Sequence, residues 1–109
     1  MRQLDVYYNE NKAGVLTELN PGTGYTFKYE SVYLSMGLPP ISVTLPKQES
    51  VFKSDTLFPF FSNMIPEGTN RDVICRTFRI DEKDFFGILY AMADKEFIGA
   101  VNIRTSNHD

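Results

Sequence analysis

The sequence has few of the side chains on which enzyme chemistry depends. Its 109 residues include one cysteine, Cys75, one histidine, His108, and no tryptophan. A single cysteine excludes an internal disulfide and a cysteine-rich zinc site, so we expect a reducing compartment. The apolar neighbours of Cys75 indicate a small buried side chain and not a reactive thiol. Because a hydroxyl nucleophile needs a base and the only histidine is the penultimate residue, a Ser-His-Asp arrangement is effectively excluded.

Long apolar runs and an excess of positive charge are also missing. The longest nearly apolar stretch, residues 85–93, is far too short to cross a bilayer, and the first residues carry no apolar signal core. The formal net charge is -3 at pH 7, and the basic residues between Arg71 and Lys83 are interleaved with acidic ones. This pattern disfavours direct binding of nucleic acid. We therefore expect a soluble cytoplasmic protein that contacts neither a membrane nor nucleic acid directly.

No group of side chains predicts a metal or cofactor site. Asp81, Glu82 and Asp84 are explained by the start of a helix, where carboxylates are favourable, and no loop with calcium-ligand spacing surrounds them. Gly22 and Gly24 lack the Gly-Lys-Ser/Thr ending of a phosphate-binding loop and predict a turn. The sequence therefore predicts no catalytic residue, no cofactor and no metal.

Aromatic side chains are abundant instead. The chain has 9 Phe and 6 Tyr, and 42% of its residues are hydrophobic. A chain of this length buries roughly two thirds of its unfolded surface, which is enough for one modest core. No repeat or long linker divides it, so we predict one domain over residues 1–104 and a frayed tail over residues 105–109.

The first half of the chain has the period of strands. Apolar residues alternate with polar ones over residues 4–8 and 15–19, with turn residues between them, which predicts a hairpin. Gly14 lies inside the second strand, where a bulge or a close backbone approach is the usual reason. A third strand is expected over residues 25–29. Residues 41–45 alternate between prolines and predict a short edge strand open to pairing with another chain.

The second half has mainly the period of helices. One or two helical turns are expected over residues 31–36, three helices follow residue 54, and residues 98–103 read as a last strand. The expected limits of the three helices are Asp55 or Thr56 as cap and Ile65 as end, Thr69 or Asn70 as start, and Asp81 as cap. The residues expected to face the core are Leu57, Phe60, Phe61 and Met64, then Val73, Ile74, Thr77 and Phe78, then Phe85, Ile88, Leu89 and Met92. This order predicts an α+β domain, with the helices on one side of a small, mainly antiparallel sheet.

One phenylalanine departs from the helical pattern. Phe58 lies off the face that Leu57, Phe61 and Met64 define, and a polar loop follows at Pro66. An exposed aromatic beside a polar loop is typical of a surface that docks a partner, although a lone exposed apolar residue needs no explanation.

Five segments carry a resemblance to a known family. They are Ala13-Gly14-Val15-Leu16, Phe27-Lys28-Tyr29, Pro40-Ile41-Ser42-Val43-Thr44-Leu45-Pro46, Phe60-Phe61-Ser62-Asn63-Met64-Ile65-Pro66-Glu67-Gly68 with Arg71, and Ile98-Gly99-Ala100-Val101. In this order they resemble the N-terminal subdomain of HipA-like serine/threonine kinase toxins, over nearly the whole chain. The fourth segment is the most specific. The chain departs from the family near Asp94, where the family usually has glycine.

The resemblance implies a binding role. In that family a much larger kinase core follows the subdomain and holds the ATP and magnesium residues, and a small helix-turn-helix antitoxin, HipB, binds both the kinase and operator DNA. These 109 residues do not reach that core, so we expect no enzyme activity. In split systems of the HipBST type the subdomain is a short protein, HipS, that binds the separate kinase HipT and neutralises it. The implied partners are therefore a HipA/HipT-like kinase and a HipB-like antitoxin in the same complex.

The resemblance also suggests which residues meet the kinase. The phenylalanine-rich helix would anchor the fold, and residues 66–71 would form a shaped loop that covers or constrains the nucleotide site of the kinase. The residues predicted to bind the partner are Phe58, Pro66, Glu67, Gly68, Thr69, Asn70 and Arg71.

Three hypotheses remain open at this point. The chain is a neutralising small subunit, or a regulatory lobe that the kinase needs for activity, or the N-terminal fragment of a full-length HipA-like kinase. The initial Met1 and the polar last residues favour a natural short gene over a fragment. The sequence does not distinguish an inhibitor from an activator.

Overall fold

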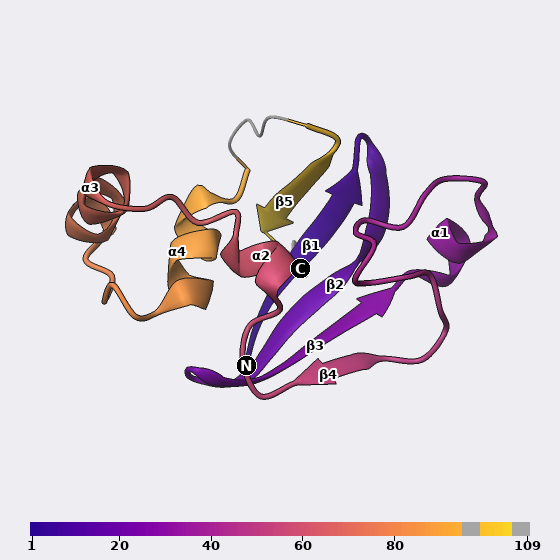
Figure 1. Cartoon of the computed structure of the whole chain (residues 1–109), viewed down its shortest axis with the longest axis horizontal. Helices are drawn as coiled ribbons and strands as arrows, with labels where there is room; N and C mark the ends of the chain where they lie inside the picture. The colour runs from indigo at the N-terminus through magenta and orange to yellow at the C-terminus, as the bar shows by residue number, and fades with distance from the viewer. Residues whose placement is uncertain (95–98, 106–109) are drawn as a thin grey trace.

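The computed structural model describes residues 1–94 and 99–105 of the chain. It contains a five-stranded antiparallel sheet and four helices, which confirms the predicted α+β class (Figure 1). The elements in chain order are β1 (Arg2–Tyr8), β2 (Asn11–Asn20), β3 (Thr23–Tyr29), α1 (Ser31–Ser35), β4 (Phe52–Ser54), α2 (Pro59–Ser62), α3 (Thr69–Phe78), α4 (Phe85–Met92) and β5 (Val101–Thr105).

The strands lie in the order β4-β3-β2-β1-β5, and each neighbouring pair is antiparallel. The first three form the predicted meander. The β1–β2 register shifts between Val6 and Tyr7, opposite Gly14. A Cβ on Gly14 would lie 2.4 Å from the carbonyl oxygen of Lys28 and 2.7 Å from the ring of Phe27. Both reasons expected for this glycine, a bulge and a close approach, are therefore confirmed.

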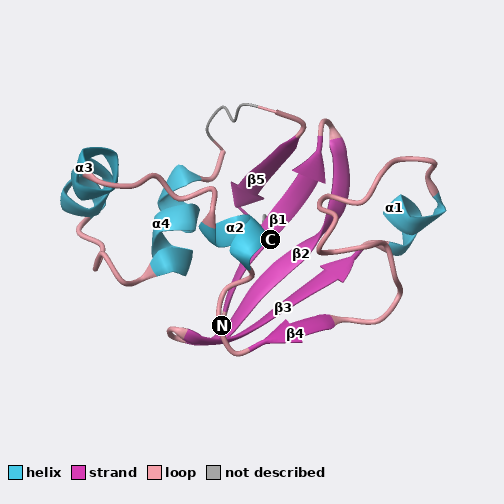
Figure 2. Cartoon of the chain, in the orientation of Figure 1, coloured by secondary structure: helices cyan, strands magenta, loops and turns pink. Residues whose placement is uncertain are grey.

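The core lies on one face of the sheet. Helices α2 and α4 and the segment between α1 and β4 cover that face (Figures 1 and 2). Phe27 of β3 lies at its centre, with ring centroids 4.9 Å from Tyr29 and 5.8 Å from Phe61. The largest fully buried side chains include Tyr29, Tyr33, Phe27, Phe61, Phe86, Leu4, Leu16, Ile88, Leu89 and Ile103. Each such apolar side chain contributes about 1.5–3 kcal/mol when it leaves water.

The prediction of a strand over residues 41–45 is wrong. That segment forms a tight turn with one isolated bridge between Ser42 and Leu45, and the edge strands of the sheet are β4 and β5. The reason is a side chain from another strand. The hydroxyl of Tyr29 accepts the N–H of Ile41 at 3.1 Å and donates to the carbonyl of Leu45, so backbone groups that a strand would pair with a neighbour bond to a tyrosine.

Helix α2 is shorter than predicted and starts later. Its N-cap position is Phe58, with Pro59 in the first turn as expected and no side-chain cap from Asp55 or Thr56. Phe61 is fully buried. Phe58 is also buried, 9% exposed, with its ring 6.3 Å from that of Phe61. The expectation of an exposed Phe58 is therefore wrong, because this residue precedes the helix and the helical period does not govern its direction.

Helix α3 starts at Thr69, as predicted, but its expected inward face is wrong in part. Val73 and Phe78 are 50% and 51% exposed, and Thr77 is exposed. Ile74 and Cys75 are half-buried against the core, so Cys75 is less enclosed than expected. The helix has no fully buried residue because it lies at one end of the molecule, where its main neighbour is α4 (Figure 1).

Helix α4 is capped by Asp84 and not by Asp81. The Asp84 carboxylate accepts the N–H of Gly87 at 3.0 Å, whereas Asp81 accepts the N–H of Lys83 at 2.8 Å in the preceding turn. The later start changes the inward face. Phe86 is buried and Phe85 is 39% exposed, so the inward direction expected for Phe85 is wrong, whereas Ile88 and Leu89 are buried as predicted.

The last strand is shifted relative to its prediction. It was expected over residues 98–103, but β5 spans Val101–Thr105, and Ile98 lies outside the described residues. Thr105 therefore belongs to the sheet. Its N–H and hydroxyl bond the carboxylate of Asp94 at 3.1 and 2.6 Å. Asp94 has a φ of 67°, a left-handed conformation that glycine adopts without strain.

Candidate partner-binding surface

The 66–71 turn comprises the end of the connection from α2 to α3, residues 66–68, and the first turn of α3, residues 69–71, at one end of the molecule (Figure 1). Pro66 and Arg71 are half-buried, and the four residues between them are exposed. The structure therefore brings six of the seven predicted contact residues together on one turn. The seventh, Phe58, packs beneath the surface in the core.

Two features hold this turn in shape. Gly68 has a φ of 62°, which favours glycine, and its carbonyl accepts the N–H of Asp72 at 3.1 Å as α3 begins. The Arg71 side chain reaches back, and its Nε donates to the carbonyl of Pro66 at 3.0 Å. The same guanidinium lies over the ring of Phe85, 5.8 Å from its centroid. Arg71 thus fixes the turn internally and against α4. A turn that is already ordered loses less conformational entropy when it forms a complex.

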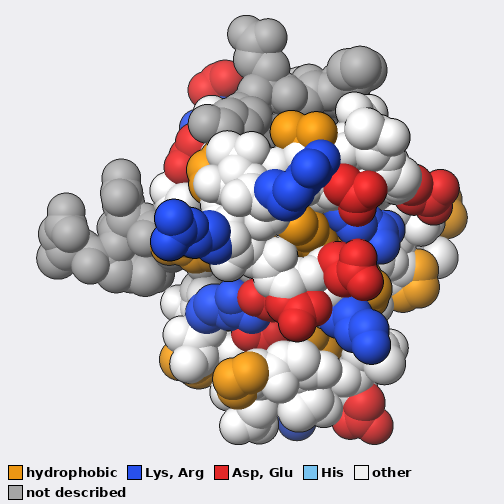
Figure 3. All heavy atoms as spheres, turned by 90° about the vertical axis from the view of Figure 1, so that its left-hand side faces the viewer, with side chains coloured by type: hydrophobic (Ala, Val, Ile, Leu, Met, Phe, Trp, Pro, Cys, Tyr) orange, Lys and Arg blue, Asp and Glu red, His pale blue; other side chains and the backbone are white. Residues whose placement is uncertain are grey.

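Partly exposed apolar side chains lie on both helices at this end of the molecule. Val73 and Phe78 of α3 and Phe85 and Tyr90 of α4 are all between 39% and 51% exposed. Figure 3 shows basic, acidic and apolar side chains intermixed on this end of the molecule. Partly exposed aromatics among charged groups are common at protein interfaces. Sequence reasoning placed Val73 and Phe78 inside, because neighbouring apolar residues on a helix point about 100° apart and the pattern alone does not select the buried one.

A groove of about 680 Å³ lies where α3 ends, beside α4 and the start of β1. Its lining includes Phe78, Arg79 and Tyr90, and also Arg2 and Asp84. No residue of the 66–71 turn lines it. This groove has no local sequence signal, because its walls come from residues 1–3 and residues 78–91, which are far apart in the chain.

Arg2, which lines the groove, forms ion pairs with both Glu18 and Asp84. Arg2 donates to Glu18 from Nε at 2.8 Å and to Asp84 at 2.8 and 3.3 Å. The hydrogen bond from Arg2 holds the pKa of Asp84 below its usual range. Glu18 is only 2% exposed and also accepts the Tyr25 hydroxyl at 3.2 Å. Burial, together with the charge of Glu18, raises the pKa of Tyr25 to about 12. Asp84 therefore stays charged and Tyr25 stays neutral near pH 7, which suits a structural role better than proton transfer.

The described residues offer little for other kinds of site. Within residues 1–94 and 99–105, no three His, Cys, Asp or Glu side chains come together in a way that could hold a metal ion. No described helix is long and apolar enough to cross a membrane. His108 lies outside the described residues.

Comparison with known proteins relates this chain to a family, to a solved structure and to a bacterial protein. Residues 4–104 match the family described as the HipA N-terminal domain. A solved structure of the N-terminal domain of HipA toxin aligns with a TM-score of 0.69 and 26% identity, over 100% of this chain and 96% of that chain. An uncharacterized protein of Haemophilus influenzae (strain Rd) is 37% identical over 81 residues, which are 74% of this chain and 73% of the relative. The aligned part thus covers most of both short chains.

Proposed function

Because this chain belongs to the HipA N-terminal domain family, we propose that it is the non-catalytic small subunit of a split HipA-like toxin–antitoxin system. It binds a separately encoded serine/threonine kinase and neutralises it. A HipB-like helix-turn-helix antitoxin is the further member expected in the complex. The 109 residues correspond to the N-terminal domain of such toxins and not to their kinase domain.

One observation supports a separate subunit most directly. The match to the Haemophilus influenzae protein covers 73% of that protein with only 81 residues, so the relative is itself about as short as this chain. A short relative is what a separately encoded domain predicts.

The exposed turn over residues 66–71 supports contact with a partner. It is pre-formed by Gly68 and by the bond from Arg71 to Pro66, and it continues into a helix without a fully buried residue. A pre-formed turn beside partly exposed aromatics can bury apolar area in a complex at little ordering cost. We propose that this turn and the adjoining face of α3 meet the kinase. Phe58 acts from inside, by packing against Phe61 in the core.

The test is co-expression with a HipA-like kinase of the same genome. The wild-type chain should restore growth that the kinase alone prevents, and the two proteins should purify together. The double variant Glu67→Arg and Thr69→Arg should lose growth rescue and weaken binding at least tenfold, because two bulky cations enter the exposed turn. Glu10→Arg with Thr23→Arg is the matched control, since it changes the same residue types at exposed positions elsewhere.

The outcomes separate the hypotheses. Growth rescue by the control but not by the 66–71 double variant supports a neutralising contact at this turn. Equal rescue by both variants, with both folded, removes the turn from the interface. Kinase activity that requires this chain would instead identify an activating lobe.

A further inference from the structure

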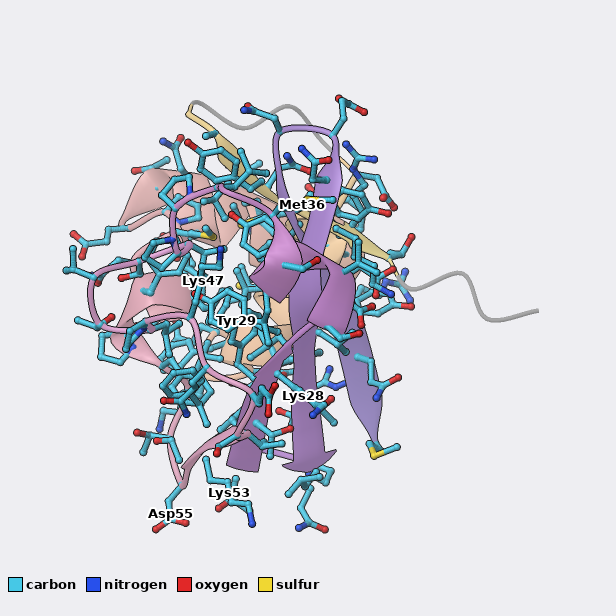
Figure 4. The ribbon with its side chains drawn as sticks, turned by 90° about the vertical axis from the view of Figure 1, so that its right-hand side faces the viewer. Lys28, Tyr29, Met36, Lys47, Lys53 and Asp55 are labelled. Carbon is cyan, nitrogen blue, oxygen red and sulfur yellow. The ribbon has the colours of Figure 1, made fainter. Side chains whose placement is uncertain are left out.

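The long segment between α1 and β4, residues 36–51, is fixed by hydrogen bonds from one side chain of β3 and from one side chain of its own. The Tyr29 hydroxyl bonds Ile41 and Leu45, and Lys47 Nζ donates to the carbonyls of Met36 at 2.7 Å and Leu38 at 2.9 Å. Figure 4 shows Lys47 and Met36 on this segment, with Tyr29 beneath it. A connection this long without helix or strand is uncommon in a small domain and is often functional.

These bonds present one apolar side chain at the tip of a tight turn. Ile41 and Leu45 are 6% and 3% exposed and anchor the two sides of the turn. Val43 between them is 94% exposed, which exceeds the exposure of every other large apolar side chain among the described residues. A β-branched residue is a poor choice for a turn, where Gly, Asn or Asp fit better.

Several polar groups around Val43 have partners within the turn. Leu45 N–H donates to the carbonyl of Ser42 at 3.1 Å, and Thr44 N–H donates to Ser42 Oγ at 3.2 Å. The two hydroxyls of Ser42 and Thr44 bond each other at 2.9 Å. Groups that bond each other lose little when water is removed, so this tip can enter an apolar pocket with a small desolvation penalty.

We infer that the Val43 turn, residues 42–44, is a second contact with the kinase partner and inserts Val43 into an apolar pocket on its surface. This inference rests on the proposed function. The segment lies on the same side of the sheet as α2 and α4 and shares their core, so a partner that covers the helical side meets it (Figures 1 and 4). The turn itself carries no cation that would recognise nucleic acid or an anionic lipid.

The experiment measures the affinity of purified variants for the kinase. Val43→Asp should weaken binding about tenfold or more, because a carboxylate cannot enter an apolar pocket unpaired. Val43→Ala should weaken it less, and Val43→Ile should retain it, so that affinity follows side-chain size. Val32→Asp is the matched control, since Val32 is also exposed, at 65%, on the neighbouring helix α1, and it should change affinity less than twofold.

The possible results are distinguishable. If the wild-type chain binds the kinase and Val43→Asp binds equally well, the inference is overturned while the proposed function stands. If the wild-type chain does not bind the kinase, both are overturned. If Val43→Asp and Val32→Asp weaken binding equally, the loss does not depend on Val43 and the inference also fails. Circular dichroism and melting temperature check that each variant is folded.

Discussion

Asp84 performs two structural roles that substitutions can separate. Its carboxylate caps α4 through Gly87 and pairs with Arg2, which in turn holds the buried Glu18. Through these contacts one side chain connects the start of β1, the second strand and the helix that covers the core. Substitutions here should change stability without touching the proposed contact surface.

The pairing makes stability depend on pH in a defined direction. The pKa of Asp84 is lowered in the folded protein, mainly by its hydrogen bonds from Arg2. Its stabilisation is therefore fully present above the unfolded pKa of about 3.9 and is lost as the pH falls through the folded pKa. Asp84→Asn keeps an effective cap but loses the pair, so wild type should be more stable above about pH 5 and the two should converge near about pH 2.

Urea unfolding of the two proteins across this pH range measures the difference. Asp84→Ala should lose a further 0.5–2 kcal/mol or so at every pH, because it also removes the cap. A difference between wild type and Asp84→Asn that stays constant with pH would show that the Arg2 pair does not stabilise the fold.

Gly14 should tolerate no side chain. Gly14→Ala would place a methyl group 2.4 Å from a backbone oxygen of Lys28, and the sheet must shift to accept it. We expect a loss of about 1–3 kcal/mol in thermal or urea unfolding. Gly37→Ala is the control, because a Cβ there meets no atom within 4 Å, and it should change stability by less than about 0.5 kcal/mol. Equal stability of both variants would contradict the close packing of β2 on β3.

At the scale of elements, α3 differs from the other helices of the second half. It has no fully buried residue, whereas four residues of α4 are buried. Positive-φ residues flank it, Gly68 before its first residue and Arg79 after its last. Few buried contacts give a low free energy of local opening.

Hydrogen exchange should resolve this difference. The amides of α3 should exchange at least tenfold faster than those of α4 in the free protein, because α3 opens without disturbing the core. On addition of the kinase, α3 and the 66–71 turn should become protected while β2 stays unchanged. Protection confined to the uncovered face of the sheet would place the interface elsewhere.

The elements that the sequence predicted well are those whose causes are local. The hairpin and the third strand follow from alternating residues and turn signals, and α3 starts where Thr69 follows Gly68. The failures have distant causes. A tyrosine hydroxyl from β3 decides the conformation of residues 41–45, and Arg2, far away in the chain, pairs with Asp84 rather than Asp81. The local sequence pattern around residues 41–45 and around Asp84 indicates neither contact.

At the scale of the whole molecule, α2, α4 and the segment over residues 36–51 share one core with the sheet. The candidate contact turn was predictable as a polar loop between two helices, and the family resemblance indicated its residues. The groove beside Arg2 and the exposed Val43 were not predicted, because exposure depends on packing between segments far apart in the chain.

The measurement that tests the central claim most directly is a titration of the purified HipA-like kinase with this protein, followed by phosphate transfer from ATP to a protein substrate. The account predicts that activity falls to near zero at about one equivalent, and that the Glu67→Arg, Thr69→Arg variant shifts the titration to at least tenfold higher concentration. Kinase activity that is unchanged by an excess of the folded protein, or that rises on its addition, would contradict it.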